Sequence, residues 1–455
     1  MKILYSNKNK TGFRQINLYS KDSEKQIDTK TALFMNVKIP AEINRRSFIT
    51  FIRSVIQRAE LHKLEKISFN FNQVKNLLEI DEYDCAELFI KNIVLAGYHF
   101  DTYKSKKDSV LEEALIYGTF SRVEKSAFKN GTLVGKNINT TRDLANTPAN
   151  LMTPTILANQ VKKIFKSAPK TKVKILEEKD LKKNKMNLVL AVGQGSAEKS
   201  KFIIIEYMNG PKNQKPTVII GKGITFDTGG VDVKPAGKFI DMYMDMTGAA
   251  VSVGTIKSII DLKIKKNIVV LIPAVENAIS GSAYRPGDII TSMSGKTVAI
   301  GHTDAEGRLV MADTITYAEC YKPETIIDIA TLTGASLVAV GQRASVIMSK
   351  NNTIQSDMIS TGESVGDYLW PLPTWNEFSE HLKSDYADIC NISNVRYGGT
   401  ITAGMFLYEF VKMHKNEPNW IHLDIAPRME SIKSDNLAKG ATGEPIAMLV
   451  KYLGK

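Results

Sequence analysis

The fold class is decided within residues 201–275, by the stretches KFIIIEYM (201–208), TVIIGKG (217–223), GAAVSVGTIKSIIDL (248–262) and NIVVLIPAV (267–275). The first, second and fourth are short runs of β-branched and aliphatic residues, which is typical of strands buried on both faces. The third has the length and apolar spacing of a helix. Buried strands separated by helices predict a largely parallel sheet that is covered by helices on both faces.

The same alternation extends to both sides of this region. Further strands are predicted at KVKIL (172–176), NLVLAVG (187–193) and TIIDIATL (325–332), and further helices at TILANQVKKIFKSA (155–168) and RLVMADTITYAECY (308–321). Nearer the N-terminus, apolar alternation predicts strands at 31–39 and 67–72, and helical spacing predicts helices at 46–64 and 81–100.

A segment punctuated by proline separates the two regions. Residues 133–154 are helical in their first half, and Pro148 and Pro154 follow. We therefore predict an α/β protein of two domains, with a smaller N-terminal α/β domain and a larger C-terminal domain built on a mixed, mostly parallel central sheet flanked by helices. The predicted ranges are 1–128 for the first domain, 129–147 for a linking helix and 148–455 for the second domain.

The charge of the chain is unevenly distributed. The sequence carries 60 Lys+Arg and 48 Asp+Glu, a formal net charge of +12. Residues 1–220 hold 38 basic and 22 acidic residues, whereas residues 221–455 hold 22 and 26. A basic half joined to a mildly acidic half fits a nucleic-acid-binding surface, and it fits equally a carboxylate-rich active site in the second half.

Composition excludes several classes of protein. With 43% apolar and 24% charged residues the chain is neither collagen-like nor disordered. Its three cysteines form no C-x-x-C pair, which argues against a disulfide framework and against a thiolate zinc site. The N-terminus lacks the apolar core of a signal peptide, and no apolar run reaches the ~18 residues of a membrane span. We expect a cytoplasmic protein that does not enter membranes.

Three segments concentrate charged residues where the loop after a buried strand would usually be neutral. They are IGKGITFDTGGVDVK (220–234), DMYMDMTGAA (241–250) and GHTDAEGRLVMAD (301–313). In an extended conformation Asp304, Glu306 and Arg308 would project from one face, because side chains at i, i+2 and i+4 point the same way. Two carboxylates so close repel each other unless a cation lies between them, and Arg308 is one candidate for that cation.

Asp227 and Asp245 add two further carboxylates, and a doubly wound sheet would gather all four at the carboxyl ends of its strands, where ligands bind. Four converging carboxylates need more positive charge than one arginine supplies. Two divalent metal ions about 3.5–4 Å apart would supply it and would form a hydrolytic site. From residue types alone the alternatives stay open, since a D-x-E tripeptide is usually solvated surface and glycines can simply permit tight turns.

Taken together, these segments resemble the M17 family of leucyl aminopeptidases. The motifs that carry the resemblance are GKGITFDTGG (221–230), MDMTGAA (244–250) and TDAEGRLVMAD (303–313), and TDAEGRL is the signature of that family. The similarity continues through NTPANLMTP (146–154), YRPGDII (284–290), DIATLTGA (328–335), residues 384–407 and HLDIA (422–426). It covers about residues 140–443, which it identifies as a catalytic dinuclear metallopeptidase domain, whereas the first 128 residues match only in position and general character.

The resemblance implies two divalent ions per subunit. One ion would be held by Lys222, Asp227, Asp245 and Glu306. The other would be held by Asp227, Asp304 and Glu306, together with the main-chain carbonyl of Asp304. A lysine that serves as a ligand must be neutral, which burial beside a dication makes possible. A ligand set without His or Cys suits Mn²⁺, Zn²⁺ or Mg²⁺, and the sequence does not choose among them.

The resemblance also implies a metal-dependent aminopeptidase that releases leucine and similar residues from the N-terminus of peptide substrates. A water bridging the metals would attack the scissile carbonyl, Lys234 would stabilise the oxyanion, and Arg308 would hold a bicarbonate that acts as general base. The side-chain pocket would be lined by Met242, Thr331, Leu332 and Gly334. Since relatives assemble as hexamers with active sites facing an interior cavity, we expect a homohexamer.

Three positions depart from the family pattern. His302 stands where the family usually has Asn, and we expect it to contact the substrate rather than a metal, because the metal site is already filled. Pro427 follows HLDIA where a small residue is common, and Glu444 lies in GATGEP (440–445) where GATGFG is usual. These departures leave the metal site intact and bear on the side-chain preference.

Two other classes of function compete with the enzyme. The basic front half would suit a DNA-binding accessory protein, a role that some bacterial relatives have, but its lysines are scattered and form no recognisable DNA-binding motif. An inactive structural paralogue is disfavoured, because all five metal ligands are retained together with Lys234 and Arg308.

Overall fold

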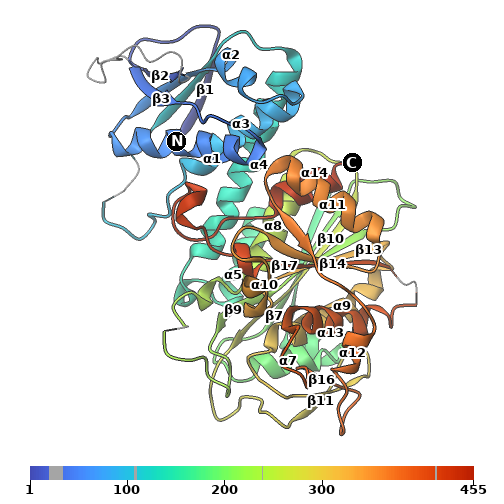
Figure 1. Cartoon of the computed structure of the whole chain (residues 1–455). Helices are drawn as coiled ribbons and strands as arrows, with labels where there is room; N and C mark the ends of the chain where they lie inside the picture. Colours follow the sequence, from blue (N-terminus) through green and yellow to red (C-terminus); the bar gives the residue numbers. More distant parts are fainter. Residues whose placement is uncertain (20–33, 107–109, 238, 416–417) are drawn as a thin grey trace. The chain divides into compact units, whose positions relative to one another are not determined.

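The computed structural model describes residues 1–19, 34–106, 110–237, 239–415 and 418–455, which form two compact units (Figure 1). Unit 1 comprises Met1–Asn139, Ser364–Gly366 and Ser431–Gly440. Unit 2 comprises Thr140–Glu363, Asp367–Glu430 and Ala441–Lys455. The division falls within helix α4 (Arg122–Asn146), which begins before the linking helix predicted at 129–147. The predicted domain boundaries themselves stay a prediction.

Unit 1 is built on a parallel five-stranded sheet in the order β1-β5-β4-β2-β3. Its strands are β1 (Lys2–Ser6), β2 (Arg14–Tyr19), β3 (Phe34–Lys38), β4 (Lys66–Asn70) and β5 (Glu113–Tyr117). Helices α1 (Arg45–Leu61) and α3 (Glu82–Ala96) pack against each other and confirm the helices predicted at 46–64 and 81–100. Their apolar faces bury Phe48, Ile52 and Phe89 in the core of the unit.

The structure shortens one predicted strand of unit 1 and describes only part of another. The strand predicted at 67–72 ends at Asn70, because the Asn70 side chain accepts a hydrogen bond from the amide of Asn72 and so starts helix α2 (Phe71–Val74). Of the strand predicted at 31–39, residues 31–33 lie outside the described residues, and the remainder contains β3.

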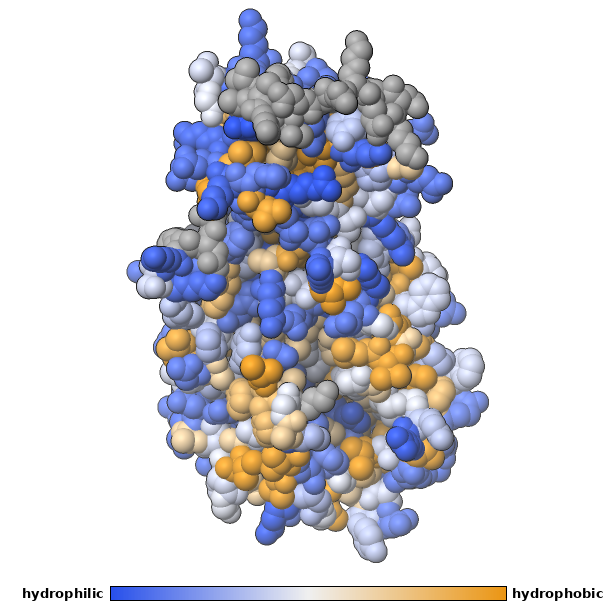
Figure 2. Space-filling model, turned by 60° about the vertical axis from the view of Figure 1, so that its left-hand side comes forward, coloured by the Kyte–Doolittle hydropathy of each residue, from blue (hydrophilic) through white to orange (hydrophobic). Residues whose placement is uncertain are grey.

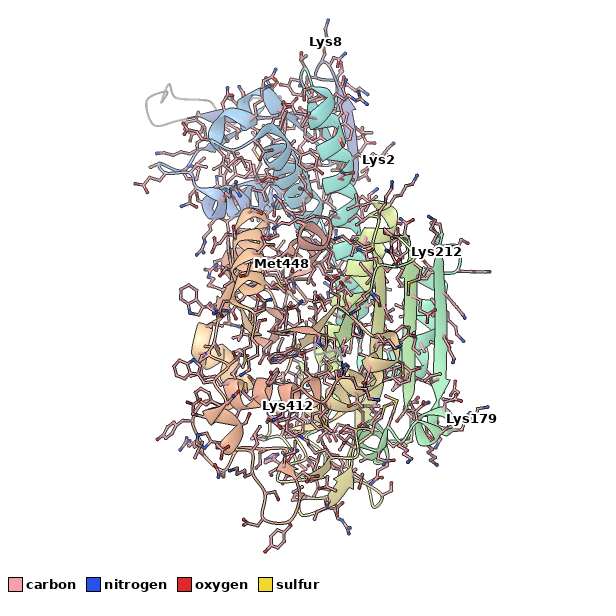
Figure 3. The ribbon with its side chains drawn as sticks, turned by 90° about the vertical axis from the view of Figure 1, so that its right-hand side faces the viewer. Lys2, Lys8, Lys179, Lys212, Lys412 and Met448 are labelled. Carbon is pink, nitrogen blue, oxygen red and sulfur yellow. The ribbon has the colours of Figure 1, made fainter. Side chains whose placement is uncertain are left out.

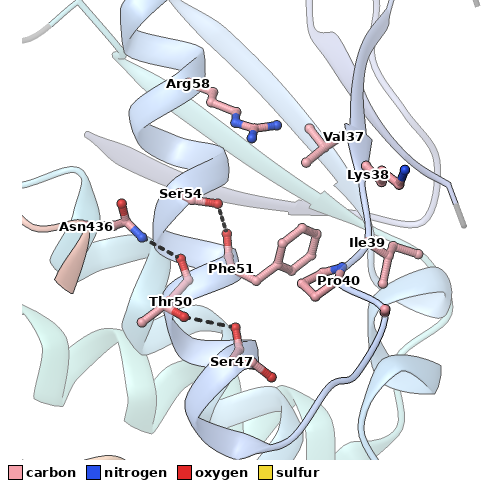
Figure 4. Close-up of a pocket in the computed structure, with 11 residues that line it drawn as sticks. Val37, Lys38, Ile39, Pro40, Ser47, Thr50, Phe51, Ser54, Arg58 and Asn436 are labelled. Atoms are coloured by element: carbon pink, nitrogen blue, oxygen red, sulfur yellow. Dashed lines mark hydrogen bonds between the residues drawn. The ribbon is translucent and has the colours of Figure 1, made fainter. Parts of the chain in front are cut away.

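A cavity of about 450 Å³ in unit 1 is lined by the end of β3, the chain that follows it and helix α1 (Figure 4). Val37, Ile39 and Pro40 line one side of it, and Phe51 lines the other. The Asn436 amide donates a hydrogen bond to the carbonyl oxygen of Thr50, at 3.1 Å. This bond ties the distant segment 431–440 to α1, which explains why that segment belongs to unit 1.

Unit 2 contains a nine-stranded sheet, which confirms the predicted α/β class with a mixed, mostly parallel sheet. The order is β15-β14-β17-β13-β8-β10-β7-β6, with β9 paired to β10. The ladders β17–β13, β13–β8 and β8–β10 are parallel, and β10–β7, β7–β6 and β17–β14 are antiparallel. The strands are β6 (Thr171–Glu177), β7 (Lys201–Met208), β8 (Thr217–Gly221), β9 (Gly223–Asp227), β10 (Asn267–Asn277), β13 (Thr325–Ala330), β14 (Ser345–Ser349), β15 (Leu369–Pro371) and β17 (Asn419–Asp424).

Helices cover both faces of this sheet (Figure 1). On one face α8 (Thr247–Asp261) contacts β8, β10 and β13 and packs against α14 (Ile446–Leu453). On the other face α9 (Glu306–Ala318) contacts the same strands and packs against α7 (Asn187–Gly193) and α13 (Gly399–Val411). The remaining elements are α5 (Pro154–Ile164), α6 (Glu178–Lys183), α10 (Gly334–Val340), α11 (Asn352–Val365), α12 (Glu377–Glu380) and the small sheet β11 (Ile289–Thr291), β12 (Thr297–Ala299) and β16 (Ile389–Cys390).

The strand predicted at 187–193 was wrong, because these residues form helix α7. A run of seven apolar residues does not distinguish a buried strand from a buried helix. The deciding contact comes from far along the chain, where the buried Asp313 carboxylate accepts hydrogen bonds from the amides of Leu188 (2.8 Å) and Val189 (3.3 Å). These bonds satisfy amide groups at the start of the helix that have no partner within it.

The surface of the molecule is mixed in character. On the face drawn in Figure 2, hydrophilic residues interrupt the hydrophobic ones over most of the area. Within the described part of the chain, no helix combines the length and the hydrophobicity that crossing a bilayer requires.

Candidate active site

A cleft of about 760 Å³ in unit 2 opens at the carboxyl ends of the parallel strands. Lys222 directly follows β8, Thr331 directly follows β13, and Ala426 lies two residues after β17, and all three line the cleft. The lining includes eleven of the twelve predicted site residues, namely Lys222, Asp227, Lys234, Met242, Asp245, Asp304, Glu306, Arg308, Thr331, Leu332 and Gly334. This is the edge of an open α/β sheet at which ligands bind.

The acidic residues reach the cleft from three local structures. Asp227 is the last residue of β9, and Asp245 lies between a short 3-10 helix (Met242–Met244) and α8. Glu306 is the first residue of α9, so Asp304, Glu306 and Arg308 do not form the extended segment that the sequence suggested. Asp304 precedes the helix and the other two lie in its first turn, yet all three line the cleft. The positive end of the helix dipole also favours a carboxylate at Glu306.

Three buried carboxylates converge in the cleft. Ligand oxygens of Asp227, Asp245 and Glu306 all lie within 4.8 Å of one another. The Lys222 ammonium lies 2.9 Å from Asp245 Oδ2 and 2.8 Å from Glu306 Oε1, and it donates a hydrogen bond to the carbonyl oxygen of Thr331 at 2.9 Å.

A second lysine neutralises the other side of the cluster. The Lys234 ammonium lies 2.7 Å from Asp227 Oδ2 and also pairs with Asp304 Oδ1. Two lysines thus share four carboxylates, which leaves the cluster short of positive charge.

The donor set fits divalent cations. The oxygens Asp245 Oδ2, Asp304 Oδ1 and Glu306 Oε1 are buried, and among the described residues each has only a lysine ammonium as its partner. Burial and the neighbouring Asp227 raise the pKa of Glu306 to about 8, and burial raises the pKa of Asp245 to about 6. These raised pKa values mean that the charged carboxylates are destabilised in the cluster. A cation placed between them would stabilise their charged forms.

The two lysines differ in the protonation state that their proposed roles require. Burial would lower the pKa of Lys222, but Asp245, Glu306 and Asp227 outweigh burial and raise it above its usual value. A role as metal ligand therefore requires a dication to displace the ammonium proton. The pKa of Lys234 is also raised, because Asp227, Glu306 and Asp304 outweigh its burial, and this lysine stays charged.

Two glycines allow the backbone to pass close to the side chains of the cluster. A Cβ at Gly307 would lie 2.6 Å from Lys222 Nζ, so only glycine lets α9 pass the lysine at this distance. Gly229 has a φ of +89°, which favours glycine. Its amide donates a hydrogen bond to Asp227 Oδ1 at 2.9 Å and so orients that carboxylate.

Arg308 presents a half-buried cation to the cleft. Its Nη1 donates a hydrogen bond to the carbonyl oxygen of Asn391 at 2.8 Å, whereas its buried Nε finds no partner among the described residues. Burial lowers the pKa of Arg308 to about 10, which leaves the guanidinium charged at neutral pH.

His302 is the one predicted site residue that does not line the cleft. Its Nδ1 accepts a hydrogen bond from the amide of Asp304 at 3.1 Å, and its side chain is 47% exposed. In this arrangement the ring caps the turn before α9. Its predicted contact with substrate stays a prediction.

Two residues that support the site were missed in the sequence. Asn277, the last residue of β10, donates a hydrogen bond to Asp227 Oδ1 at 2.8 Å. Asp424, the last residue of β17, accepts hydrogen bonds from the Leu332 amide at 3.1 Å and the Thr333 hydroxyl at 2.7 Å, and so shapes the loop after β13. A polar residue that ends a buried strand is the signal that could have revealed both.

Comparison with known proteins agrees with this geometry. Residues 139–450 match the sequence profile described as "Cytosol aminopeptidase family, catalytic domain". The chain belongs to this family. It is 36% identical over 429 residues to the cytosol aminopeptidase of Haemophilus influenzae, covering 94% of this chain and 86% of that protein. It is 42% identical over 377 residues to the cytosol aminopeptidase of Pseudomonas aeruginosa, covering 82% and 75%.

Solved structures of the same fold are also similar. One, described as "Bottromycin maturation enzyme BotP in complex with Mn", superposes with a TM-score of 0.84 at 27% identity and covers 94% of this chain and 92% of that chain. Family membership confirms the resemblance inferred from the sequence motifs and identifies a metal-dependent aminopeptidase, a hydrolase that acts on peptides.

Proposed function

We propose that this aminopeptidase binds two divalent ions in the cleft and releases leucine and similar residues from the N-terminus of peptides. The observation that carries the proposal is the convergence of Asp227, Asp245 and Glu306, all buried, with ligand oxygens within 4.8 Å of one another. Asp304 and a neutral Lys222 would complete the ligand set. When bound, the ions supply the Lewis acidity that polarises the scissile carbonyl and activates the attacking water.

The identity of the ions is narrowed by the donor set. Oxygen ligands with one lysine nitrogen suit Mn²⁺, Zn²⁺ and Mg²⁺. Because the similar BotP structure is a complex with Mn, we propose Mn²⁺ as the first ion to test.

Lys234 is proposed as the group that stabilises the oxyanion. It lines the cleft beside Asp227 and Asp304, and these carboxylates hold its pKa above the usual value against the effect of burial. A lysine that remains an ammonium donates hydrogen bonds to the carbonyl oxygen as negative charge develops there, and such donors contribute most when water is excluded.

Arg308 is proposed to hold a bicarbonate that acts as general base. The support is its buried Nε, which finds no hydrogen-bond acceptor among the described residues although the guanidinium lines the cleft. A planar guanidinium matches a planar oxyanion through paired hydrogen bonds. An anion at this point could accept a proton from the attacking water.

The preference for leucine is proposed from the apolar wall of the cleft. Met242, Leu332 and Gly334 line the cleft, and Ala426 and Met429 line the same cavity. An aliphatic side chain buried there would gain about 25 cal/mol for each Å² of apolar surface removed from water.

The assembly and the location of the enzyme also remain proposals, namely a homohexamer in the cytoplasm. The DNA-binding alternative would require clustered positive charge. The lysines labelled in Figure 3 instead lie on separate elements, with Lys2 in β1, Lys179 in α6 and Lys412 directly after α13. This scattered pattern favours the peptidase as the function to test first.

The decisive experiment measures hydrolysis of leucine 4-nitroanilide by metal-free protein and by protein reconstituted with Mn²⁺. We expect activity only with the metal, and none on the N-acetylated substrate, which lacks the free amine. Glu306→Gln, with its fold checked by circular dichroism, serves as the inactive control. If folded, metal-loaded wild-type protein hydrolyses no aminoacyl anilide, the proposed function is refuted.

A further inference from the structure

Two of the departures from the family pattern lie in segments that meet at one wall of the cleft. After β17 the chain runs through Ala426–Glu430, and four of these five residues line the cleft. The exception is Arg428, whose side chain is buried, with 3% of its surface exposed. Pro427, one of the departures, therefore lies in the wall next to a buried arginine.

The partner of Arg428 is Glu444, another of the departures. Arg428 Nε lies 2.8 Å from Glu444 Oε2 and Nη2 lies 2.7 Å from Oε1, so two parallel hydrogen bonds join the side chains. Arg428 Nη1 donates a third bond to the carbonyl oxygen of Gln342, at 2.6 Å, and Gln342 itself lines the cleft. One guanidinium thus ties together three separate segments of unit 2.

Backbone contacts join the same two segments. The Thr442 amide donates a hydrogen bond to the Met429 carbonyl at 3.3 Å, and Glu430 forms an antiparallel bridge with Ala441. The Thr442 hydroxyl also donates to the carbonyl oxygen of Arg428. The side-chain pair therefore reinforces the backbone contact between the wall segment 426–430 and the segment 441–444.

A bidentate pair fixes both the distance and the orientation of its partners, because the guanidinium fork matches a carboxylate in only a few geometries. Only 11% of the Glu444 side chain is exposed. Removing one partner would leave the other as an uncompensated buried charge, which is strongly unfavourable. The segment would then shift to bring that charge to water, and the wall would shift with it.

We propose that the Arg428–Glu444 pair is a positioning pair that sets the size of the N-terminal side chain accepted by the enzyme. Neither residue lines the cleft, so the pair acts through Ala426 and Met429, which lie in the wall. With the wall held in place, the cavity favours leucine-sized side chains over larger aromatic ones. This inference rests on the proposed function, since it concerns the same peptide substrate.

The test compares Arg428→Lys, Glu444→Gln and the exchanged double variant Arg428→Glu with Glu444→Arg. Each is loaded with Mn²⁺, its metal content is measured, and kcat and KM are determined for alanine, leucine and phenylalanine 4-nitroanilides. We expect each single variant to lower the leucine-to-phenylalanine ratio of kcat/KM about tenfold, mainly through KM, with metal content unchanged. The exchanged variant should restore the ratio toward the wild-type value, because it restores an ion pair.

A matched control is Arg285→Lys, which alters an arginine–carboxylate pair whose arginine side chain is 72% exposed. It should leave the ratio unchanged. Folding is checked by circular dichroism and melting temperature. If both single variants unfold, the ratio is measured on Arg428→Met with Glu444→Leu, which replaces the buried pair by apolar side chains.

Folded variants that keep the wild-type ratio within threefold, or that lose activity on all three substrates equally, would overturn the proposal. The second result would mean that the pair only stabilises the fold. Wild-type protein that cleaves none of the substrates would instead refute the proposed function, so the two failures are distinguishable.

Discussion

The contact between Gly307 and Lys222 allows a sharp test of the site. A Cβ at position 307 would lie 2.6 Å from Lys222 Nζ and 2.9 Å from its Cδ. Ordinary contacts begin near 3.4 Å, so in Gly307→Ala the end of the lysine must move by close to an ångström. That end now lies 2.9 Å from Asp245 Oδ2 and 2.8 Å from Glu306 Oε1, and both pairs would lengthen or break.

The stability of the variant should change little. The atom in the way is the tip of a flexible side chain, and alanine inside a helix is more favourable than glycine by about 1 kcal/mol. Activity should fall much more, because displacing a group at a reaction centre by about 1 Å can cost on the order of a hundredfold. We therefore expect kcat/KM to drop about a hundredfold while the melting temperature stays within a few degrees of wild type.

The assay is leucine 4-nitroanilide hydrolysis together with the metal content of dialysed protein. Gly281→Ala is the matched control, since a Cβ there meets no atom within 4 Å, and it should behave as wild type. Gly307→Ala with kcat/KM within threefold of wild type and normal metal content would refute the idea that Lys222 must occupy its observed position.

Further predictions concern stability, metal and positioning. Burial raises the pKa of Asp313 to about 7, whereas the pKa of Asp in an unfolded chain is about 3.9. Between these pH values the folded protein holds a proton on Asp313 that the unfolded chain has lost, so the free energy of unfolding should fall as the pH rises from about 4 to 7. Urea unfolding at pH 5 and 7.5 should show a smaller change of stability in Asp313→Asn than in wild type. The same variant places an amide near the Met293 N–H, which now donates to the carboxylate at 2.8 Å, and should cost about 1–3 kcal/mol, so an unchanged urea midpoint would contradict the assigned bond. Metal removal by chelation should abolish activity but keep the circular dichroism spectrum, since two lysines pair with the carboxylates, and added Mn²⁺ should raise the melting temperature; unfolding on chelation would contradict this. Asp424→Asn should raise KM about tenfold with normal metal content, because the Thr333 hydroxyl loses its charged acceptor at 2.7 Å; an effect on kcat alone would count against a positioning role.

The sequence predicted those parts of the molecule that depend on local pattern. Strands β8, β10 and β13 are continuous buried apolar runs, and the helices between them have clear periodicity, so the parallel sheet followed from them. The carboxylates were predicted to meet because parallel strands place their carboxyl ends at one edge. They do meet, but only Asp227 ends a strand, whereas Asp245 lies two residues before α8 and Glu306 begins α9.

The features that the sequence did not predict depend on contacts between residues that lie far apart in the chain. Helix α7 looked like a strand because its capping carboxylate, Asp313, lies over a hundred residues away. Asp304 and Glu306 meet across a helix start rather than along a strand, and nothing in the tripeptide distinguishes these cases. The partner of Glu444 was likewise invisible, since an arginine sixteen residues earlier gives no local signal.

The pairing of strand β10 predicts where the chain tolerates insertions and deletions. Its residues 268–271 pair with β8 and its residues 274–277 pair with β9, with a register irregularity between Val275 and Asn277. A single strand thus fixes the spacing between Lys222, which directly precedes β9, and Asp227, which is the last residue of β9. An insertion or deletion inside β10 would slide one ligand against the other, whereas the same change in the turn before Asn267 would leave both in register. Length variation among functional homologues should accordingly avoid residues 268–277 and accumulate in the turn.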